Sequence, residues 1–94
     1  MSAFHTCIVS SVSNTEQKII NHYRLIRTID IFHNTEVFSV FLTTASPEDS
    51  SEAFVYDISR NSHTAEQFLD MICKNNVTAL SLREIAEDFI SSQI

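Results

Sequence analysis

The sequence of 94 residues contains no glycine, no tryptophan and a single proline. Phosphate-binding loops and dinucleotide-binding turns need glycine where the backbone approaches the ligand closely, so the usual forms of both are excluded. Tight turns are expected to use asparagine instead, because asparagine tolerates positive φ better than most residues. No hydrophobic run reaches the roughly 18 residues of a membrane span.

Positive charge is also scarce, with six Lys and Arg against twelve Asp and Glu. The six cations are scattered, whereas nucleic-acid and anionic membrane surfaces bind clustered positive charge. We therefore expect neither kind of partner, and no motif indicates a cofactor. The N-terminus lacks the basic and apolar regions of a secretory signal. Cys7 and Cys73 match no CxxC pattern, which predicts reduced thiols in a cytoplasmic protein.

The pattern that is present predicts one α+β domain, with its strands first and its helices last. Alternating β-branched and aromatic residues indicate four strands, at residues 3–12, 19–31, 36–44 and 53–58. The period then changes to that of a helix, which predicts helices at 64–75 and 81–92.

Local signals mark the ends of the two helices. Thr64 with Gln67 and Ser81 with Glu84 have the spacing of capping boxes at helix starts. The pair Asn75-Asn76 is typical of a helix end.

Two turns, one symmetric about residues 15 and 16 and one at His33-Asn34, predict how the strands pair. The first turn places Phe4, Ile8 and Val12 on one face with Tyr23. The second places Leu25 opposite Leu42 and Ile29 opposite Phe38. Both turns select the same side of the second strand. This agreement predicts a four-stranded antiparallel meander with both helices packed on one face.

The C-terminal part resembles a known pattern. The segments that carry the resemblance are Val55-Tyr56-Asp57-Ile58-Ser59, Ala65-Glu66-Gln67-Phe68-Leu69, Asn76-Val77-Thr78 and Leu82-Arg83-Glu84-Ile85-Ala86-Glu87-Asp88-Phe89-Ile90. Residues 55–90 are similar to an uncharacterised family of small proteins from anaerobic Gram-positive bacteria. The chain departs from that pattern at Ala79, Leu80 and Ser81, where Pro and His are expected. The resemblance implies a bacterial cytoplasmic setting and no particular activity.

The sheet face opposite the helices is less polar than a solvated face should be. In the assumed register it carries Val9, Ile26, Val37 and Phe41. Apolar exposure of this kind often marks an interface. The leading hypothesis is a non-enzymatic protein–protein interaction module that self-associates through this face, as a homodimer.

Two alternatives remain open from the sequence. His5 and Cys7 share one face of a strand, and the assumed register brings His22 near Cys7. A thiolate with two imidazoles suits zinc, so these residues are candidates for a metal-binding protein or a small enzyme, although a fourth ligand is missing. The other alternative is a small apolar ligand bound between the sheet and the helices.

Overall fold

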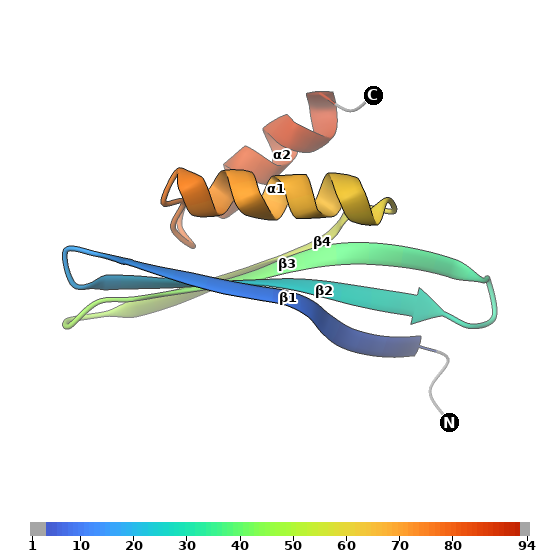
Figure 1. Ribbon diagram of the computed structural model, residues 1–94, viewed down its shortest axis with the longest axis horizontal. Helices are drawn as coiled ribbons and strands as arrows, with labels where there is room; N and C mark the ends of the chain where they lie inside the picture. The colour runs from blue at the N-terminus through green and yellow to red at the C-terminus, as the bar shows by residue number, and fades with distance from the viewer. Residues whose placement is uncertain (1–3, 93–94) are drawn as a thin grey trace.

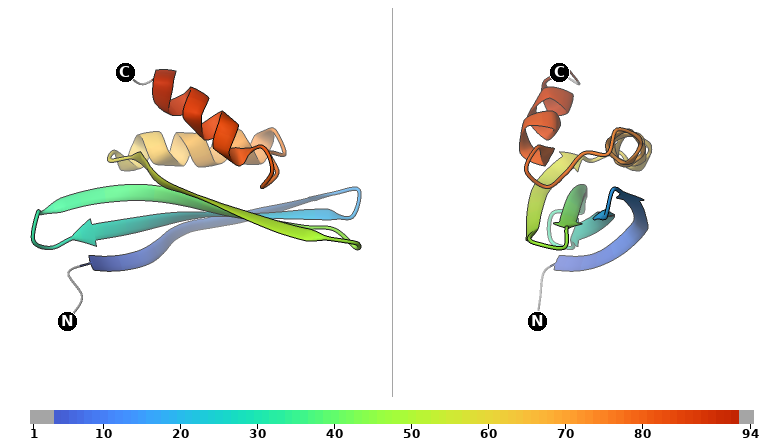
Figure 2. Two further views of the ribbon diagram at one scale, coloured as in Figure 1. Left: turned by 180° about the vertical axis from the view of Figure 1, so that it is seen from behind. Right: turned by 90° about the vertical axis from the view of Figure 1, so that its left-hand side faces the viewer.

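The computed structural model describes residues 4–92 as a four-stranded antiparallel sheet followed by two helices. Its elements are β1 (Phe4–Glu16), β2 (Ile19–Asp30), β3 (Thr35–Ala45), β4 (Ser50–Ser59), α1 (Ser62–Lys74) and α2 (Leu82–Ser92). The strands are neighbours in chain order, and both helices lie on the same face of the sheet (Figures 1 and 2). The predicted α+β meander is therefore confirmed.

The β1–β2 turn lies later in the chain than the sequence pattern suggested. Strand β1 continues to Glu16, and the turn is formed by Gln17 and Lys18, with φ of 50° and 69°. Positive φ at both central residues suits the twist of a tight hairpin. Asn34 and Asn76 also have positive φ, as expected for asparagine. The prediction that asparagine forms the tight turns was wrong for this turn, because the backbones of Gln17 and Lys18 adopt the left-handed region here.

A bulge in β1 changes which side chains share a face. Val12 lies opposite Tyr23 in the β1–β2 pairing. The register shifts between Ile8 and Ser10, so Ile8 lies opposite Ile26. One extra residue in a strand reverses the inward and outward alternation beyond it. Val12 therefore shares the helix-covered face with Tyr23. Ile8 and Phe4 lie on the opposite face, and their predicted placement was wrong.

The β2–β3 connection is longer than the predicted two-residue turn. It spans residues 31–34, and the Asp30 carboxylate accepts hydrogen bonds from the backbone N–H groups of Phe32 and His33. Tyr23 consequently pairs with Leu42, two residues away from the predicted register. Because the shift is an even number of residues, the predicted division of β2 and β3 into two faces still holds.

Strand β4 has its own irregularity. Val55 pairs with Val40 but Ser59 pairs with Phe38, so β4 carries two more residues than β3 over this stretch. Asp57 has a φ of 56°, and its backbone N–H donates to Ser39 Oγ at 3.0 Å. The bulge is stabilised there by a hydroxyl that belongs to β3, and Ser39 is fully buried.

The first helix begins earlier than its predicted capping box. Its N-cap is Asn61, whose side-chain oxygen accepts a 3.0 Å hydrogen bond from the Thr64 N–H. Thr64 lies inside the helix, so a capping box that starts at Thr64 was wrong. The predicted end is confirmed, because α1 stops at Lys74 and Asn75 forms the C-cap. The second helix starts directly after Ser81.

The core lies between the sheet and the helices. The apolar faces of α1 and α2 pack on the covered side of β2, β3 and β4, and the rings of Phe68 and Phe89 lie 4.7 Å apart between the two helices. The core residues are Tyr23, Leu25, Phe38, Val40, Leu42, Ile58, Ala65, Phe68, Leu69, Ile72, Val77, Ala79, Leu82 and Ala86.

Polar side chains connect the sheet to the α1–α2 loop. Tyr23 donates its hydroxyl hydrogen to the Val77 carbonyl at 2.7 Å, and Asn14 Nδ2 donates to Asn76 Oδ1 at 2.9 Å. Thr44 Oγ1 accepts from the Ala79 N–H at 2.9 Å. Burial raises the pKa of the Tyr23 hydroxyl above its ordinary value, although the Asn14 hydrogen bond acts in the opposite direction. These bonds position the loop that sets where α2 begins.

Neither helix within residues 4–92 has both the length and the apolar character needed to cross a membrane.

Candidate functional site

The candidate site is the sheet face that no helix covers, which we call the outer face. The end-on view in Figure 2 shows both helices on the other side of the sheet. Because side chains alternate along each strand, the pairing of β2, β3 and β4 defines this face. Its central residues on these three strands are His22, Arg24, Ile26, Thr28, Val37, Ser39, Phe41, Thr43, Glu52 and Phe54.

Apolar side chains occupy the middle of the outer face. Ile26 and Phe41 are partly buried, and Val37 is buried. Phe54 pairs with Phe41 across β3 and β4 and is 44% exposed. Ile8 reaches this face from β1 because of the bulge and is 59% exposed. The face therefore combines exposed apolar groups at its sides with partly covered ones at its centre.

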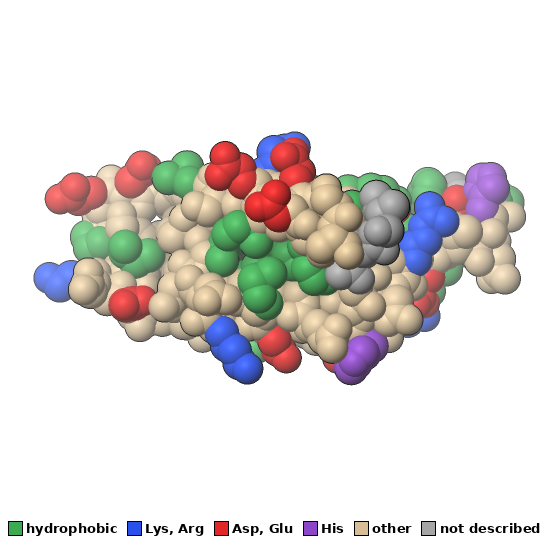
Figure 3. Space-filling model, turned by 90° about the horizontal axis from the view of Figure 1, so that it is seen from above, with side chains coloured by type: hydrophobic (Ala, Val, Ile, Leu, Met, Phe, Trp, Pro, Cys, Tyr) green, Lys and Arg blue, Asp and Glu red, His purple; other side chains and the backbone are tan. Residues whose placement is uncertain are grey.

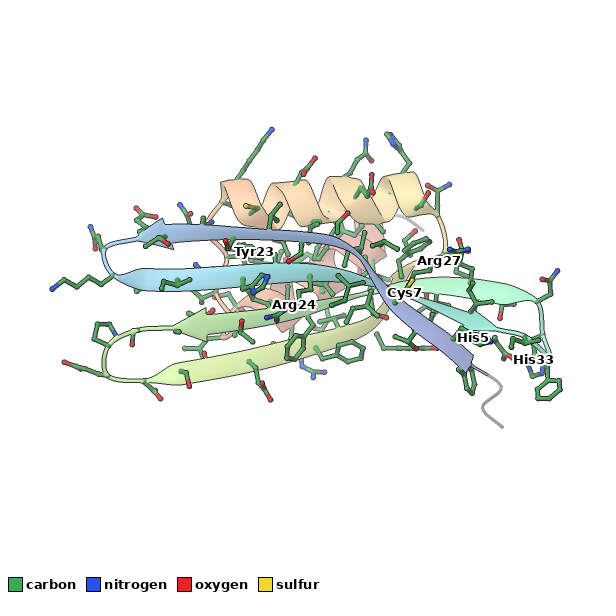
Figure 4. The ribbon with its side chains drawn as sticks, turned by 60° about the horizontal axis from the view of Figure 1, so that its bottom comes forward. His5, Cys7, Tyr23, Arg24, Arg27 and His33 are labelled. Atoms are coloured by element: carbon green, nitrogen blue, oxygen red, sulfur yellow. The ribbon has the colours of Figure 1, made fainter. Side chains whose placement is uncertain are left out.

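A cation lies within this apolar surface (Figure 4). The Arg24 guanidinium carbon lies 5.3 Å from the centre of the Phe41 ring, a cation–π arrangement. Its Nη2 donates to His22 Nδ1 at 2.8 Å. Its Nη1 is shielded from solvent and has no hydrogen-bond partner within the described chain. Arg24 therefore keeps unused hydrogen-bonding capacity on the outer face.

Ser11 and His22 resemble a nucleophile and its base, but their hydrogen bonds have the wrong direction. Ser11 Oγ lies 2.6 Å from His22 Nε2. A guanidinium only donates, so His22 Nδ1 must accept from Arg24 and the imidazole proton lies on Nε2. His22 thus donates to Ser11 and does not take its proton, as a general base would have to do. This arrangement orients the side chains and does not activate a nucleophile.

One carboxylate on the outer face is available. Glu52 pairs with Thr43, which in turn pairs with His22, so Glu52 lies on the same face as Arg24. Its side chain is exposed, and no ion pair involves it among residues 4–92. The outer face therefore carries a cation and an anion that do not pair with each other.

The four predicted interface residues fall into two groups. Ile26, Val37 and Phe41 lie on the outer face as the sequence pattern placed them. Val9 lies at the β1 bulge, has no cross-strand partner in the β1–β2 register and is 42% exposed. The sequence pattern missed Phe54 and Glu52, because it did not predict how β4 pairs with β3.

The predicted nearness of His22 to Cys7 was wrong. Cys7 lies opposite Arg27, as Figure 4 shows, whereas His22 lies opposite Ser13. Arg27 and His22 are five positions apart on β2, which corresponds to roughly 16 Å and to opposite faces of the sheet. Three or more His, Cys, Asp or Glu side chains suited to a metal ion do not gather anywhere in the described part of the chain.

Three surface hollows have volumes of about 200 to 220 Å³. Ligand pockets usually enclose about 300–1,000 Å³. One hollow lies at the end of the outer face, between Phe4, Thr28, Val37 and Tyr56. None of these three hollows is lined by a buried residue of the core between the sheet and the helices.

Comparison with known proteins identifies a family without an assigned activity. The family of unknown function DUF6514 matches residues 4–92, so the chain belongs to this family. The match extends over the strands as well as the C-terminal segments that carried the resemblance. Neither the curated proteins nor the solved structures that were compared give a match.

Proposed function

We propose that this member of the family of unknown function is a non-enzymatic interaction module that binds a second copy of itself through the outer face. The observation that carries the proposal is the apolar set of Ile26, Phe41 and Phe54, none of them fully buried, on a sheet face that no helix covers. The face of an antiparallel sheet that meets water normally carries polar side chains. A large exposed apolar area on such a face marks an interaction site.

The outer face is large enough for a stable dimer. The protein extends 45 Å along its longest axis. Four strands spaced about 4.8 Å apart over that length present roughly 800 Å² on one face. A standard interface buries about 800 Å² on each partner. Sheet-on-sheet contact would therefore bury an ordinary interface area.

The helix side is less suited to self-association. Figure 3 shows acidic side chains around a hydrophobic strip on that side. Two copies that met through this side would bring like charges together, which is unfavourable. The exposed acidic residues of the two helices are Glu66, Asp70, Glu84, Glu87 and Asp88.

The two alternative functions have less support. The metal hypothesis required His5, Cys7 and His22 to meet, and the β1–β2 register separates His22 from the other two residues. The apolar-ligand hypothesis required space between sheet and helices. There, Tyr23 and Phe68 are fully buried within one continuous core.

The cysteines agree with a reducing compartment. Cys7 and Cys73 are both free thiols. Free thiols are the ordinary state in a bacterial cytoplasm, and we propose that compartment for this protein.

Light scattering at micromolar concentration tests self-association. We expect a mass of twice the chain's 10.7 kDa. Phe54→Asp should give monomers, because it introduces two carboxylates into the paired faces. Phe32→Asp is the matched control, since Phe32 is 81% exposed in the β2–β3 turn, outside the outer face. A monomeric wild-type protein, or a Phe54→Asp variant that remains dimeric, would contradict the proposal.

A further inference from the structure

On the outer face, His22 lies between a cation and a hydroxyl group. Its Nδ1 accepts a hydrogen bond from Arg24 Nη2 at 2.8 Å, and its Nε2 lies 2.6 Å from Ser11 Oγ. Because a guanidinium only donates, the Arg24 contact requires a neutral imidazole with its proton on Nε2. The lone pair of Nδ1 is therefore the position at which this ring can take up a second proton.

Proton uptake at Nδ1 breaks the contact between His22 and Arg24. A protonated imidazole donates from both nitrogens and accepts at neither, so two donors would face each other across a distance that is now 2.8 Å. Both groups would also carry positive charge. Arg24 Nη1 is already shielded from solvent and has no hydrogen-bond partner in the described chain, so water compensates the added repulsion poorly. The neutral ring and the present position of Arg24 depend on each other.

The strands beside β2 offer no close carboxylate to the protonated ring among residues 4–92. On β1, Ser11 contacts His22 and Ser13 lies opposite it, and both are uncharged. On β3, Thr43 lies opposite His22, and on β4, Glu52 lies opposite Thr43. Glu52 is thus two strand spacings from His22, roughly 9.6 Å between backbones, which exceeds the Debye length in physiological salt. No ion pair joins the two residues.

The contact with His22 also positions a group at the apolar centre of the outer face. It holds the Arg24 guanidinium beside the Phe41 ring, 5.3 Å from its centre. When two copies meet through this face, water is removed from these side chains. Burying two adjacent positive charges without a carboxylate is strongly unfavourable. Proton uptake by His22 and self-association therefore oppose each other.

We propose that proton uptake by His22 releases Arg24 from its contact and weakens self-association through the outer face. The inference rests on the proposed self-association and adds a condition under which it is lost. Imidazole side chains ordinarily take up a proton between about pH 8 and pH 5. Since the dimer binds fewer protons than the free chains, its dissociation constant rises as the pH falls through this range.

Analytical ultracentrifugation at a series of pH values tests this switch. Between about pH 8 and pH 5, the dimer dissociation constant should rise by roughly tenfold or more. His22→Gln should dimerise with little change over the same range, because its amide can accept from Arg24 and donate to Ser11 but takes up no proton. His63→Gln is the matched control, since His63 is exposed on α1, and its dimer should weaken in acid like the wild type.

An NMR titration of the side chains separates this inference from the proposed function, because it needs no dimer. In the neutral ring the His22 proton should lie on Nε2. The resonances of Arg24 Nε and of the Phe41 ring should change together with those of His22 as the ring takes up its second proton. Constant Arg24 resonances during that change would overturn the inference.

The association measurements give the remaining outcomes. A wild-type dimer that is indifferent to pH, or one that weakens equally in His22→Gln, would also overturn the switch while leaving self-association intact. A monomeric wild type overturns the self-association itself, and the NMR titration then decides whether the proton releases Arg24. If His22→Gln loses the circular dichroism spectrum of the folded protein, His22→Asn takes its place.

Discussion

The two faces of the sheet carry similar side chains but have different surroundings. On β3, Phe38, Val40 and Leu42 face the helices, and Val37 and Phe41 face the other way. Residues 37–40 are buried without interruption, whereas a sheet with one wet face should alternate. Val37 and Ser39 are covered within the single chain, whereas Ile26 and Phe41 are only partly buried and Phe54 is 44% exposed. The comparison supports the proposal that a second copy covers the exposed part of the outer face.

The largest expected effect comes from the covered face. Phe68→Ala should lower the free energy of unfolding by about 3–5 kcal/mol, because it removes a fully buried ring from the core. Phe54→Ala is the matched change on the outer face. It should lower the free energy of unfolding by less than about 0.5 kcal/mol, as is usual for surface substitutions. Denaturant unfolding measured by circular dichroism, at a dilution where the chains are monomers, checks both values. Equal losses would show that the two faces do not differ as described.

A smaller effect is expected at the polar edge of the covered face. Tyr23→Phe removes the hydrogen bond to the Val77 carbonyl and leaves that acceptor without a partner, a loss of about 1–3 kcal/mol. Tyr56→Phe is the control, because Tyr56 is 56% exposed. An equal loss in both variants would contradict a special role for the Tyr23 bond.

Alkaline pH provides a second readout for Tyr23. Its pKa is raised in the folded protein, so above pH about 10 unfolded chains release a proton that folded chains retain. The free energy of unfolding should therefore fall with rising pH until the folded hydroxyl also ionises. This part of the decline should be absent in Tyr23→Phe and present in Tyr56→Phe. Identical pH profiles for all three proteins would contradict the burial of this hydroxyl.

Periodicity was sufficient to predict the order of the elements and the apolar faces of β2, β3 and α1. These features depend on repeated apolar spacing, which a single substitution or a small register error does not change. An error of two residues at the β2–β3 turn kept every side chain on its predicted face.

The features that sequence reasoning missed depend on single backbone irregularities. The bulge near Val9 moved Ile8 to the outer face, and the later β1–β2 turn separated Cys7 from His22 along the strands. The positive φ of Gln17 and Lys18 placed the first turn at residues without a turn signal of their own. The periodicity of apolar residues predicts neither the bulge nor the positive φ of these turn residues. The contact between Arg24 and Phe41 could have been found from the β2–β3 pairing, but only with the correct register.

An isotope-filtered NOE experiment tests self-association through the outer face most directly. Equal amounts of labelled and unlabelled chain are mixed, so that only contacts between different chains are detected. We expect cross-peaks between chains from the side chains of Ile26, Phe41 and Phe54. Cross-peaks from α1 or α2 instead, or none at concentrations of hundreds of micromolar, would contradict self-association through this face.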